Sequence, residues 1–459
     1  MKKKKELWPG FIEVGKHVQY ARILQTQKRV FMLRATLRDY LTMSKKVIVI
    51  AGTTGVGKSQ LSIQLAKKFN GEVINSDSMQ VYKDIPIITN KHPILEREGI
   101  PHHVMNHVDW SEEYYSHRFE SECIKAIEDI HQRGKVPIVV GGTHYYLQTL
   151  FNKKVETRFS ERELTQEQLE ILQSNDPDIV YSTLVECDPD IANKYHPNDY
   201  RRVQRMLEIY YKTGKKPSET FSEQKITLKY DTLFLWLYSR PEPLFQRLDG
   251  RVDVMLERGA LQEIEQLHEY YKQNSFTPEQ CENGVWQVIG FKEFLPWLNR
   301  EPNDTTIRLE DCIERMKTRT RQYAKRQVKW IKKMLIPDIK GDIYLLDATD
   351  LSQWDVTASQ RAIAISNDFI NNLPVKQERA PEALGELLSE GETTMKKLDD
   401  WTHFTCNICR NADGKNLVAI GEKYWNIHLR SRRHKSNLKR GARKADFEKW
   451  KVHKKEPAE

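Results

Sequence analysis

The chain has 459 residues, of which 39% are hydrophobic and 10% aromatic, enough for a large core divided into two or three units. No run of eighteen or more apolar residues occurs, which excludes a membrane-spanning helix, and the six cysteines without a secretory apolar segment indicate a reducing compartment. The net charge of +9 is uneven, because residues 1–46 and 401–459 each carry +9 and the residues between them carry −9. Any polyanion site in the central part must therefore be a local cluster of charge.

Residues 1–46 form a basic N-terminal extension. In FMLRATLRDYLTM, residues 31–43, leucines recur every four residues with arginines elsewhere, a pattern typical of a mitochondrial presequence. The alternative is a basic arm without a targeting role. A product that starts at Met43 would lack this segment, so we expect longer and shorter products at different locations.

From residue 47 the pattern alternates between strands and helices. VIVIA at 47–51, GEVINSD at 71–77, VPIVV at 136–140, TLFLWLY at 232–238 and IYLLD at 343–347 read as strands. A helix is expected over 111–135, with Ser111 as its N-cap and Gly134 as its stop signal. Continuous apolar strands between helices predict a doubly wound parallel sheet.

Changes in composition divide the chain into seven parts. We predict a basic extension at 1–46, catalytic core at 47–150, a charged helical insertion at 151–228, further core with a basic helix at 229–350, a linker at 351–400, a metal-binding module at 401–440 and a basic tail at 441–459.

GTTGVGKS, residues 52–59, matches the phosphate-loop pattern between an apolar strand and a helix. The residues expected to hold phosphate are Gly52, Thr53, Thr54, Gly55, Val56, Gly57, Lys58 and Ser59. Their amides form a nest at a helix N-terminus, Lys58 supplies a compact positive charge, and Ser59 offers a hydroxyl to Mg²⁺. A nucleotide is the usual ligand of such a loop, but this chemistry does not require a nucleoside.

The aspartate that usually accompanies a nucleotide-hydrolysing loop is missing after VPIVV, which continues into GGTHYYL at 141–147. Asp77 follows the second strand instead, at the sheet edge where α/β proteins bind ligands. It can be a metal ligand, a general base or an ordinary turn aspartate.

Two basic segments have open interpretations. Residues 315–333 carry nine basic residues and no acidic one at helical spacing, which fits either a solvated helix face or a helix that faces an anion. Residues 198–210, NDYRRVQRMLEIY, place Arg201, Arg202 and Arg205 near a helix start, where they can contact a polyphosphate, a tRNA backbone or water.

The C-terminal module has the spacing Cys406-x2-Cys409-x18-His428-x5-His434. Two thiolates on a knuckle and two imidazoles on a helix predict a structural zinc site in a C2H2-type finger. The long interval resembles U1-type and matrin-type fingers, which favour RNA. Its basic residues suit phosphate contact or nuclear entry. The whole chain is therefore predicted to be an α/β P-loop protein with a doubly wound parallel sheet, a helical insertion domain and this finger.

Together these motifs resemble the tRNA dimethylallyltransferase family, also called tRNA isopentenyltransferases. The resemblance covers residues 47–335 through the segments GTTGVGKSQLSIQLA, INSDSMQVYKD, GIPHH, GGTHYYLQ, NDYRRVQRMLE, RLDGRVDVMLERGALQE, QVIGFKEF and TRQYAKRQVKW. The appended finger is similar to that of the eukaryotic, yeast-like form. One departure is Thr53, where bacterial relatives usually have proline.

The resemblance implies transfer of a dimethylallyl group from dimethylallyl diphosphate to N6 of adenine 37 in the tRNA anticodon loop, with catalytic Mg²⁺ and release of diphosphate. It implies that the phosphate loop and Arg251 hold the diphosphate, that Asp77 is the base and that Thr143 positions the reacting groups. The implied tRNA-binding residues are Asp77, Ser78, Met79, Gln80, Thr143, Arg201, Arg202, Val203, Gln204 and Arg205. The helix at 315–333 is expected to face the RNA or the diphosphate.

Two other functions remain. A small-molecule P-loop kinase would use residues 198–205 as a lid and turn over ATP, and a non-catalytic RNA-binding adaptor would keep only the finger active. The presence of Lys58, Ser59 and Asp77 argues against the adaptor. We expect a monomer without stable membrane contact, located in the mitochondrion, cytoplasm and nucleus.

Overall fold

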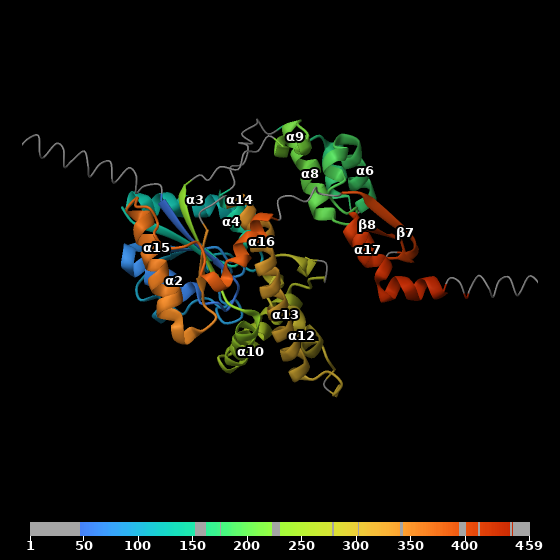
Figure 1. The fold of residues 1–459 in the computed structure, drawn as a ribbon. Helices are drawn as coiled ribbons and strands as arrows, with labels where there is room; N and C mark the ends of the chain where they lie inside the picture. The colour runs from blue at the N-terminus through green and yellow to red at the C-terminus, as the bar shows by residue number, and fades with distance from the viewer. Residues whose placement is uncertain are drawn as a thin grey trace, which may run out of the picture. The chain divides into compact units, whose positions relative to one another are not determined.

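The computed structural model describes residues 46–151, 162–174, 176–222, 230–277, 280–301, 303–339, 343–393, 401–411, 414–440 and 443. They form two compact units, the first within 1–152 and 227–395 and the second within 153–226 and 396–459 (Figure 1). The predicted presequence and basic tail lie outside the described residues, apart from Lys46 and Arg443. No described helix is both long enough and apolar enough to cross a membrane.

A parallel sheet forms the centre of the first unit and confirms the predicted fold class. Its six described strands have the order β3-β2-β4-β1-β5-β6. They are β1 (Lys46–Gly52), β2 (Gly71–Asn75), β3 (His102–His103), β4 (Val136–Gly141), β5 (Asp231–Tyr238) and β6 (Ile343–Asp347). The central strand β1 pairs with β4 on one side and β5 on the other, so its carboxyl end and the loop after it lie in the middle of one sheet edge.

Apolar side chains of β1 alternate between two cores. Val47 and Val49 face one cluster of buried residues, whereas Ile48 and Ile50 face the other. Both faces of the sheet are therefore covered, which explains why the central strands β1, β4 and β5 read as nearly continuous apolar runs.

The helices of the first unit cover both faces of the sheet. They are α2 (Lys58–Phe69), α3 (Ser116–Gln132), α4 (His144–Phe151), α10 (Pro241–Glu257), α11 (Ala260–Gln273), α12 (Phe291–Leu298), α13 (Leu309–Trp330), α14 (Ile336–Ile339), α15 (Arg361–Ile370) and α16 (Glu386–Thr393). Shorter turns are η1 (Ile94–Arg97), η2 (Gln280–Glu282), η3 (Gly284–Gln287), η4 (Ile331–Leu335), η5 (Leu351–Gln353), η6 (Asp355–Gln360) and η7 (Glu382–Leu384). Residues of α2 and α15 share one core, and these two helices lie side by side in Figure 1.

Helix α3 begins five residues later than predicted. Ser111 is not its N-cap, because the amide and hydroxyl of Ser111 both donate to Asp109 Oδ1, at 3.1 and 2.8 Å, and close a separate turn. The predicted stop is correct, since the helix ends at Gln132 and Gly134 follows with φ +67°.

The predicted linker at 351–400 is wrong for residues 351–393, which belong to the first unit. Trp354, Ala358, Ala362 and Ile365 are buried in the same core as α2. The amide of Leu345 in β6 also donates to Arg379 O at 2.7 Å. The apolar face of this segment is short and partly built from alanines, so its sequence has a weak helical pattern although it completes the core.

The second unit combines the predicted helical insertion with the C-terminal finger. Its elements are α5 (Gln166–Gln173), α6 (Pro177–Cys187), α7 (Pro189–Ala192), α8 (Tyr200–Thr213), α9 (Pro217–Ser222), β7 (His403–Arg410), β8 (Asn416–Ile420) and α17 (Glu422–Arg430). The finger contacts the insertion directly: His403 Nε2 lies 2.9 Å from Asn193 O, and His196 Nε2 lies 3.3 Å from Val418 O. Two segments some two hundred residues apart in sequence thus share one unit.

Candidate active site

The phosphate loop connects β1 to α2 and is backed by an aromatic ring. Gly57, the last loop residue before α2, has φ +98°, and a Cβ placed there would lie 2.7 Å from the ring of Trp354. Both the left-handed backbone and the close approach require glycine. Trp354, from the segment that we had predicted to be a linker, therefore supports the loop from behind.

Buried polar groups hold the start and the end of this loop. The amide of Gly52 donates to His144 Nε2 at 3.3 Å, and burial lowers the pKa of His144 to about 3, so the ring stays a neutral acceptor. Lys58 Nζ donates to Thr53 O at 2.6 Å. Burial also lowers the pKa of Lys58, to about 8, although the nearby carboxylate of Asp77 opposes this shift.

Thr54 has protein partners on both its backbone and its side chain. Its amide donates to Gln327 Oε1 at 2.8 Å, and its hydroxyl accepts from an Arg251 terminal nitrogen at 2.9 Å. Burial lowers the pKa of Arg251 to about 10, which leaves the guanidinium charged at neutral pH. Its Nε is buried without a hydrogen-bond partner among the described residues.

Ion pairs between α10 and α13 fix the position of Arg251. Asp249 pairs with Arg321, and Asp253 accepts from Lys317 Nζ at 2.8 Å. These two aspartates lie two residues before and two residues after Arg251, so they hold its helix against α13 on both sides.

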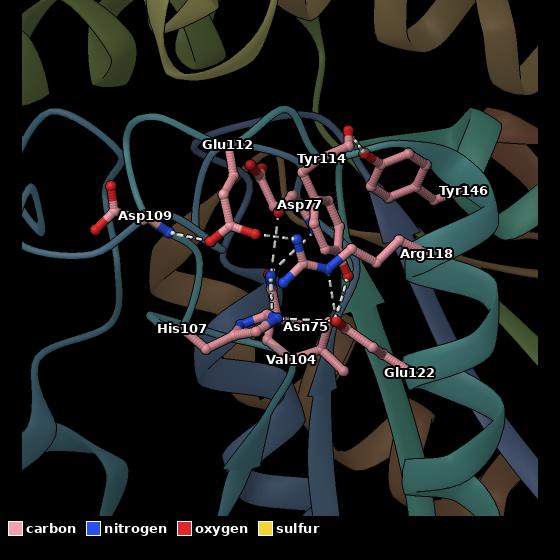
Figure 2. A network of polar contacts seen from close by, with 10 residues as sticks. All are labelled: Asn75, Asp77, Val104, His107, Asp109, Glu112, Tyr114, Arg118, Glu122 and Tyr146. Carbon is pink, nitrogen blue, oxygen red and sulfur yellow. Dashed lines mark hydrogen bonds and ion pairs between the residues drawn. The ribbon is translucent and has the colours of Figure 1, made fainter.

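Asp77 lies just beyond the carboxyl end of β2. Its backbone is held by Asn75, whose Oδ1 accepts from Asp77 N at 3.1 Å and whose Nδ2 donates to Asp77 O at 3.1 Å and to Val104 O at 2.9 Å (Figure 2). Asp77 Oδ1 accepts from Met79 N at 2.9 Å, as a turn aspartate would. Burial raises the pKa of Asp77, against the opposing effect of the charges on Lys58 and Arg251. The turn contact is thus present, and the role of Asp77 as a base or metal ligand stays a prediction that its desolvated position near two cations favours.

Thr143 lies beside Asp77 because β2 and β4 pair with each other and Ser76 N donates to Val140 O at 2.8 Å where they end. The amide of Thr143 donates to Ser76 O at 3.2 Å, and its hydroxyl accepts from Ser78 N at 3.0 Å. The buried Tyr323 hydroxyl is hydrogen-bonded to Thr143 and Gln327, and burial raises the pKa of Tyr323, so it stays protonated. Two residues of α13 thus enter the site.

A charged network fixes the chain next to Asn75 (Figure 2). Arg118 donates to Glu112 at 2.7 Å and to Glu122 at 2.9 Å. Glu122 also accepts from Tyr114 at 2.7 Å and lies 2.8 Å from His107 Nε2. The network ties α3 to residues 107–114. These residues closely follow Val104, whose carbonyl oxygen accepts from Asn75 Nδ2.

The loop, Asp77 and Arg251 line one cavity of about 280 Å³. Its described lining residues are Thr54, Gly55, Gly57, Lys58, Ser59, Gln60, Ser62, Val73, Asn75, Asp77, Gln80, Thr89, Asn90, His92, His102, Met105, Val140, Gly141, Gly142, Arg251 and Gln327. Asp77 is the single acidic residue among them, and burial lowers the pKa of His102 to about 4, so this ring is neutral at pH 7. The cavity is thus cationic around the loop and has one carboxyl opposite it.

A family model described as IPP transferase matches residues 80–334, more than half of the chain, and a second described as isopentenyl transferase matches residues 45–96. The chain belongs to the IPP transferase family. The tRNA dimethylallyltransferase of Saccharomyces cerevisiae is 84% identical over 428 residues, 93% of this chain and 100% of that protein. The tRNA dimethylallyltransferase of Schizosaccharomyces pombe is 38% identical over 88% of this chain and 97% of its own length.

A solved structure of a eukaryotic dimethylallyltransferase acting on tRNA is 86% identical. The two structures match with a TM-score of 0.82 over 89% of this chain and 100% of the solved chain. The resemblance noted in the motifs is therefore confirmed at the level of the IPP transferase family.

Several predicted loop residues of this IPP transferase have different surroundings. The Val56 side chain is buried in the core beneath the loop, and the Thr53 hydroxyl is buried without a hydrogen-bond partner among the described residues. Gln80 donates to Asn90 O at 3.0 Å and lines the cavity, whereas Ser78 and Met79 lie beside it. Only part of the predicted set therefore faces the cavity.

The arginine segment of the insertion belongs to the second unit. Arg201, Arg202 and Arg205 are exposed on α8, where Arg202 pairs with Asp199 at 3.0 Å and Arg205 with Glu208 at 2.6 Å. Val203 is fully buried, and Gln204 donates to Leu172 O at 2.6 Å. The tRNA-binding role predicted for this segment thus rests on its arginines, since Val203 and Gln204 hold the insertion together.

Helix α13 has an exposed basic side and a side that enters the site, and the predicted contact of its basic side with an anion stays a prediction. The exposed side carries Arg315, Arg319, Arg326 and Lys329, and Lys333 follows in η4. The opposite side brings Tyr323 and Gln327 into the site. Our sequence reasoning missed these two residues, together with Asn75 and His144. Uncharged polar residues four apart in the otherwise basic TRQYAKRQ were the available signal.

The predicted metal ligands of the finger come together. Ligand atoms of Cys406, Cys409, His428 and His434 all lie within 4.8 Å of one another. The backbone amide of Cys409 donates to Cys406 Sγ and Asn437 Nδ2 donates to Cys409 Sγ, both at 3.3 Å, as expected around thiolates. This closed set of two sulfurs and two nitrogens fits a zinc finger.

Proposed function

We propose that this protein transfers a dimethylallyl group from dimethylallyl diphosphate to N6 of adenine 37 in tRNA and releases diphosphate. The named activity of its relatives supports the reaction. The observation that carries the proposal is the single cavity in which Asp77 lies close to the phosphate loop, Lys58 and Arg251. One cavity thus offers a base for the nucleophile and cations for the leaving group.

The loop and its cations stabilise the departing diphosphate. Cleavage of the allylic C–O bond places negative charge on the leaving group, and preorganised amides, Lys58 and Arg251 favour that charge over the ground state. Arg251 lines the cavity and remains charged at neutral pH, as this role requires. Mg²⁺, held by the Ser59 hydroxyl and diphosphate oxygens, would add further charge neutralisation, and hard oxygen ligands suit this ion.

Asp77 removes the proton from the attacking amine. An exocyclic adenine amine is a weak nucleophile, so loss of its proton as the N–C bond forms lowers the barrier. Burial makes Asp77 a stronger base than an exposed aspartate. The Thr143 hydroxyl, held by Ser78, lies beside Asp77 and orients the amine.

The adenine must leave its stack to reach Asp77. A stacked base hides its N6 from a carboxylate within a cavity at a sheet edge, and enzymes that modify such bases extrude them into a pocket. Gln80 and Asn90 line this cavity, and side-chain amides are groups that can pair with a base edge. The residues proposed to recognise the base and the proposed catalytic base therefore line the same cavity.

The tRNA backbone is held by basic surfaces outside the cavity. The finger, with zinc at Cys406, Cys409, His428 and His434, carries a set of exposed cations. These are Arg430, Arg432, Arg433, Lys435, Lys439 and Arg440. Such residues bind phosphates without reading sequence, and the arginines of α8 and α13 have the same character.

A kinase is the weaker alternative. Strand β4 ends in Gly141 and continues into Gly142 and Thr143, without the acid that would organise Mg²⁺ and water for nucleotide cleavage. The assay that separates the two functions supplies labelled dimethylallyl diphosphate, Mg²⁺ and unmodified tRNA, with and without ATP. A tRNA with guanine in place of adenine 37 is the matched control.

We expect label in the adenine-37 tRNA without ATP and none in the guanine-37 control. Label in neither RNA, equal label in both, or a strict need for ATP would contradict the proposal.

A further inference from the structure

The side-chain amide of Gln327 joins the two loops that serve opposite ends of the proposed reaction. Gln327 Oε1 accepts from Thr54 N in the phosphate loop at 2.8 Å, and its Nε2 donates to Gly142 O in the turn after β4 at 2.9 Å. The side chain is only 4% exposed. Both halves of one buried amide are therefore used, one on each loop.

We infer that Gln327 is a positioning residue that sets the separation between the leaving-group loop and the Gly142–Thr143 turn. The inference rests on the proposed function. Thr54 is bonded to Arg251, and Thr143 lies beside Asp77, so Gln327 links the groups around the diphosphate to those around the nucleophile. A single residue then fixes the distance over which the dimethylallyl group moves.

The chemistry of the link requires an amide. Thr54 N–H needs an acceptor, and Gly142 C=O needs a donor, at two ends of one planar group. A carboxylate has no donor, an ammonium has no acceptor, and a hydrocarbon of the same size has neither. Leaving either buried backbone group unpaired is costly.

The link is also rigidly supported. Gln327 lies on α13, which is tied to α10 by Arg321 and Lys317, and Tyr323 contacts its side chain from one turn earlier. A Cβ placed on Gly142 would lie 2.4 Å from Gln327 Nε2, so the turn approaches the amide as closely as glycine permits. The distance between the two loops is thus set by a helix rather than by flexible segments.

Three variants test this role: Gln327→Met, Gln327→Glu and, as the control, Thr320→Val. Thr320 is 5% exposed on the same helix, and its hydroxyl donates only to Met316 O, at 2.8 Å, away from the cavity. Since misplacement by about 1 Å can reduce a rate about 100-fold, Gln327→Met should lower kcat about 10- to 100-fold. The KM for tRNA should stay within about twofold in all three variants.

The Gln327→Glu variant gives a signature that a purely structural role would not. Its carboxylate cannot donate to Gly142 O, but its protonated form can, so its activity relative to wild type should rise as the pH is lowered from 8 to 6. Other titratable groups around the site are present in both proteins, so the ratio of variant to wild-type activity at each pH largely removes their contribution. These groups are Asp77, Lys58, Arg251 and Tyr323. The ratio for Gln327→Met should stay flat.

Hydrogen exchange at the Thr54 amide provides a readout independent of activity. It should exchange faster in Gln327→Met than in wild type or Thr320→Val. Unchanged exchange, unchanged kcat, or a pH-independent Gln327→Glu ratio would each overturn the inference. Wild-type protein that transfers no dimethylallyl group would instead refute the proposed function. If the Met variant fails to fold, the Glu ratio decides.

Discussion

Replacing Asp77 with asparagine isolates the charge of the proposed base. Asparagine keeps the shape of the side chain and an Oδ1 that can accept from Met79 N, a bond of 2.9 Å in this structure. The turn held by Asn75 should therefore remain. What is lost is the ability to take a proton and the negative charge between Lys58 and Arg251.

The size of the effect follows from what Asp77 does. A positioned general base contributes about 10²- to 10⁴-fold, so kcat should fall by that factor, equivalent to about 2.7–5.4 kcal/mol in the barrier. The carboxylate of Asp77 also raises the pKa of Lys58, so its removal should shift the alkaline loss of substrate binding to lower pH. The affinity for tRNA should change little, because the exposed arginines that we propose to bind tRNA phosphates lie on other elements.

Single-turnover transfer of label into tRNA, with tRNA affinity measured separately by filter binding, separates these effects. Asp77→Glu is a useful companion, since it keeps the charge but displaces it. A kcat for Asp77→Asn within threefold of wild type would refute the assignment of Asp77 as the base. A large loss of tRNA affinity at unchanged kcat would refute it equally.

Three further predictions concern the loop, the core and the finger. The pKa of Lys58 is about 8 in the free protein, so its positive charge is lost as the pH rises through 8. The KM for dimethylallyl diphosphate should then rise about tenfold per pH unit. A KM that stays flat up to about pH 9.5 would contradict this prediction. Trp354→Ala should lower the free energy of unfolding in urea by about 3–5 kcal/mol, whereas Leu351→Ala, which is 51% exposed, should cost about 0.5 kcal/mol or less; equal losses would show that residues 351–393 are not part of the core. Cys409→Ser should weaken tRNA binding and lower the slope of log affinity against log salt concentration by about 0.7–0.9 per lost phosphate contact. The KM for dimethylallyl diphosphate should not change. If both the affinity and the slope were unchanged, the finger would have no role in RNA binding.

The sequence was sufficient for the parts of the site that local motifs define. The loop at 52–59 needs glycines, a lysine and a serine at fixed spacing between a strand and a helix, and Asp77 follows a short strand that comes next in the alternation of strands and helices. The zinc ligands likewise have a diagnostic spacing. In each case the chemistry and the local structure are encoded within a few residues.

The residues that were missed act across long separations. Gln327 reaches Thr54 over 273 positions and Gly142 over 185, and Trp354 packs against Gly57 from a segment with little helical signal. Their side chains are also ambiguous in sequence, because a glutamine within a basic helix resembles a solvated residue. Burial and pairing, which decide their roles, come from tertiary packing rather than from local pattern.

The most direct test of the account is the chemical identity and stoichiometry of the product. Wild-type protein is incubated with dimethylallyl diphosphate, Mg²⁺ and unmodified tRNA in the absence of ATP, and the RNA is digested to nucleosides for mass spectrometry while free diphosphate is quantified. The account predicts N6-dimethylallyladenosine and diphosphate in equal amounts. Diphosphate release without the modified adenosine, or a modified adenosine that forms only with ATP, would contradict it.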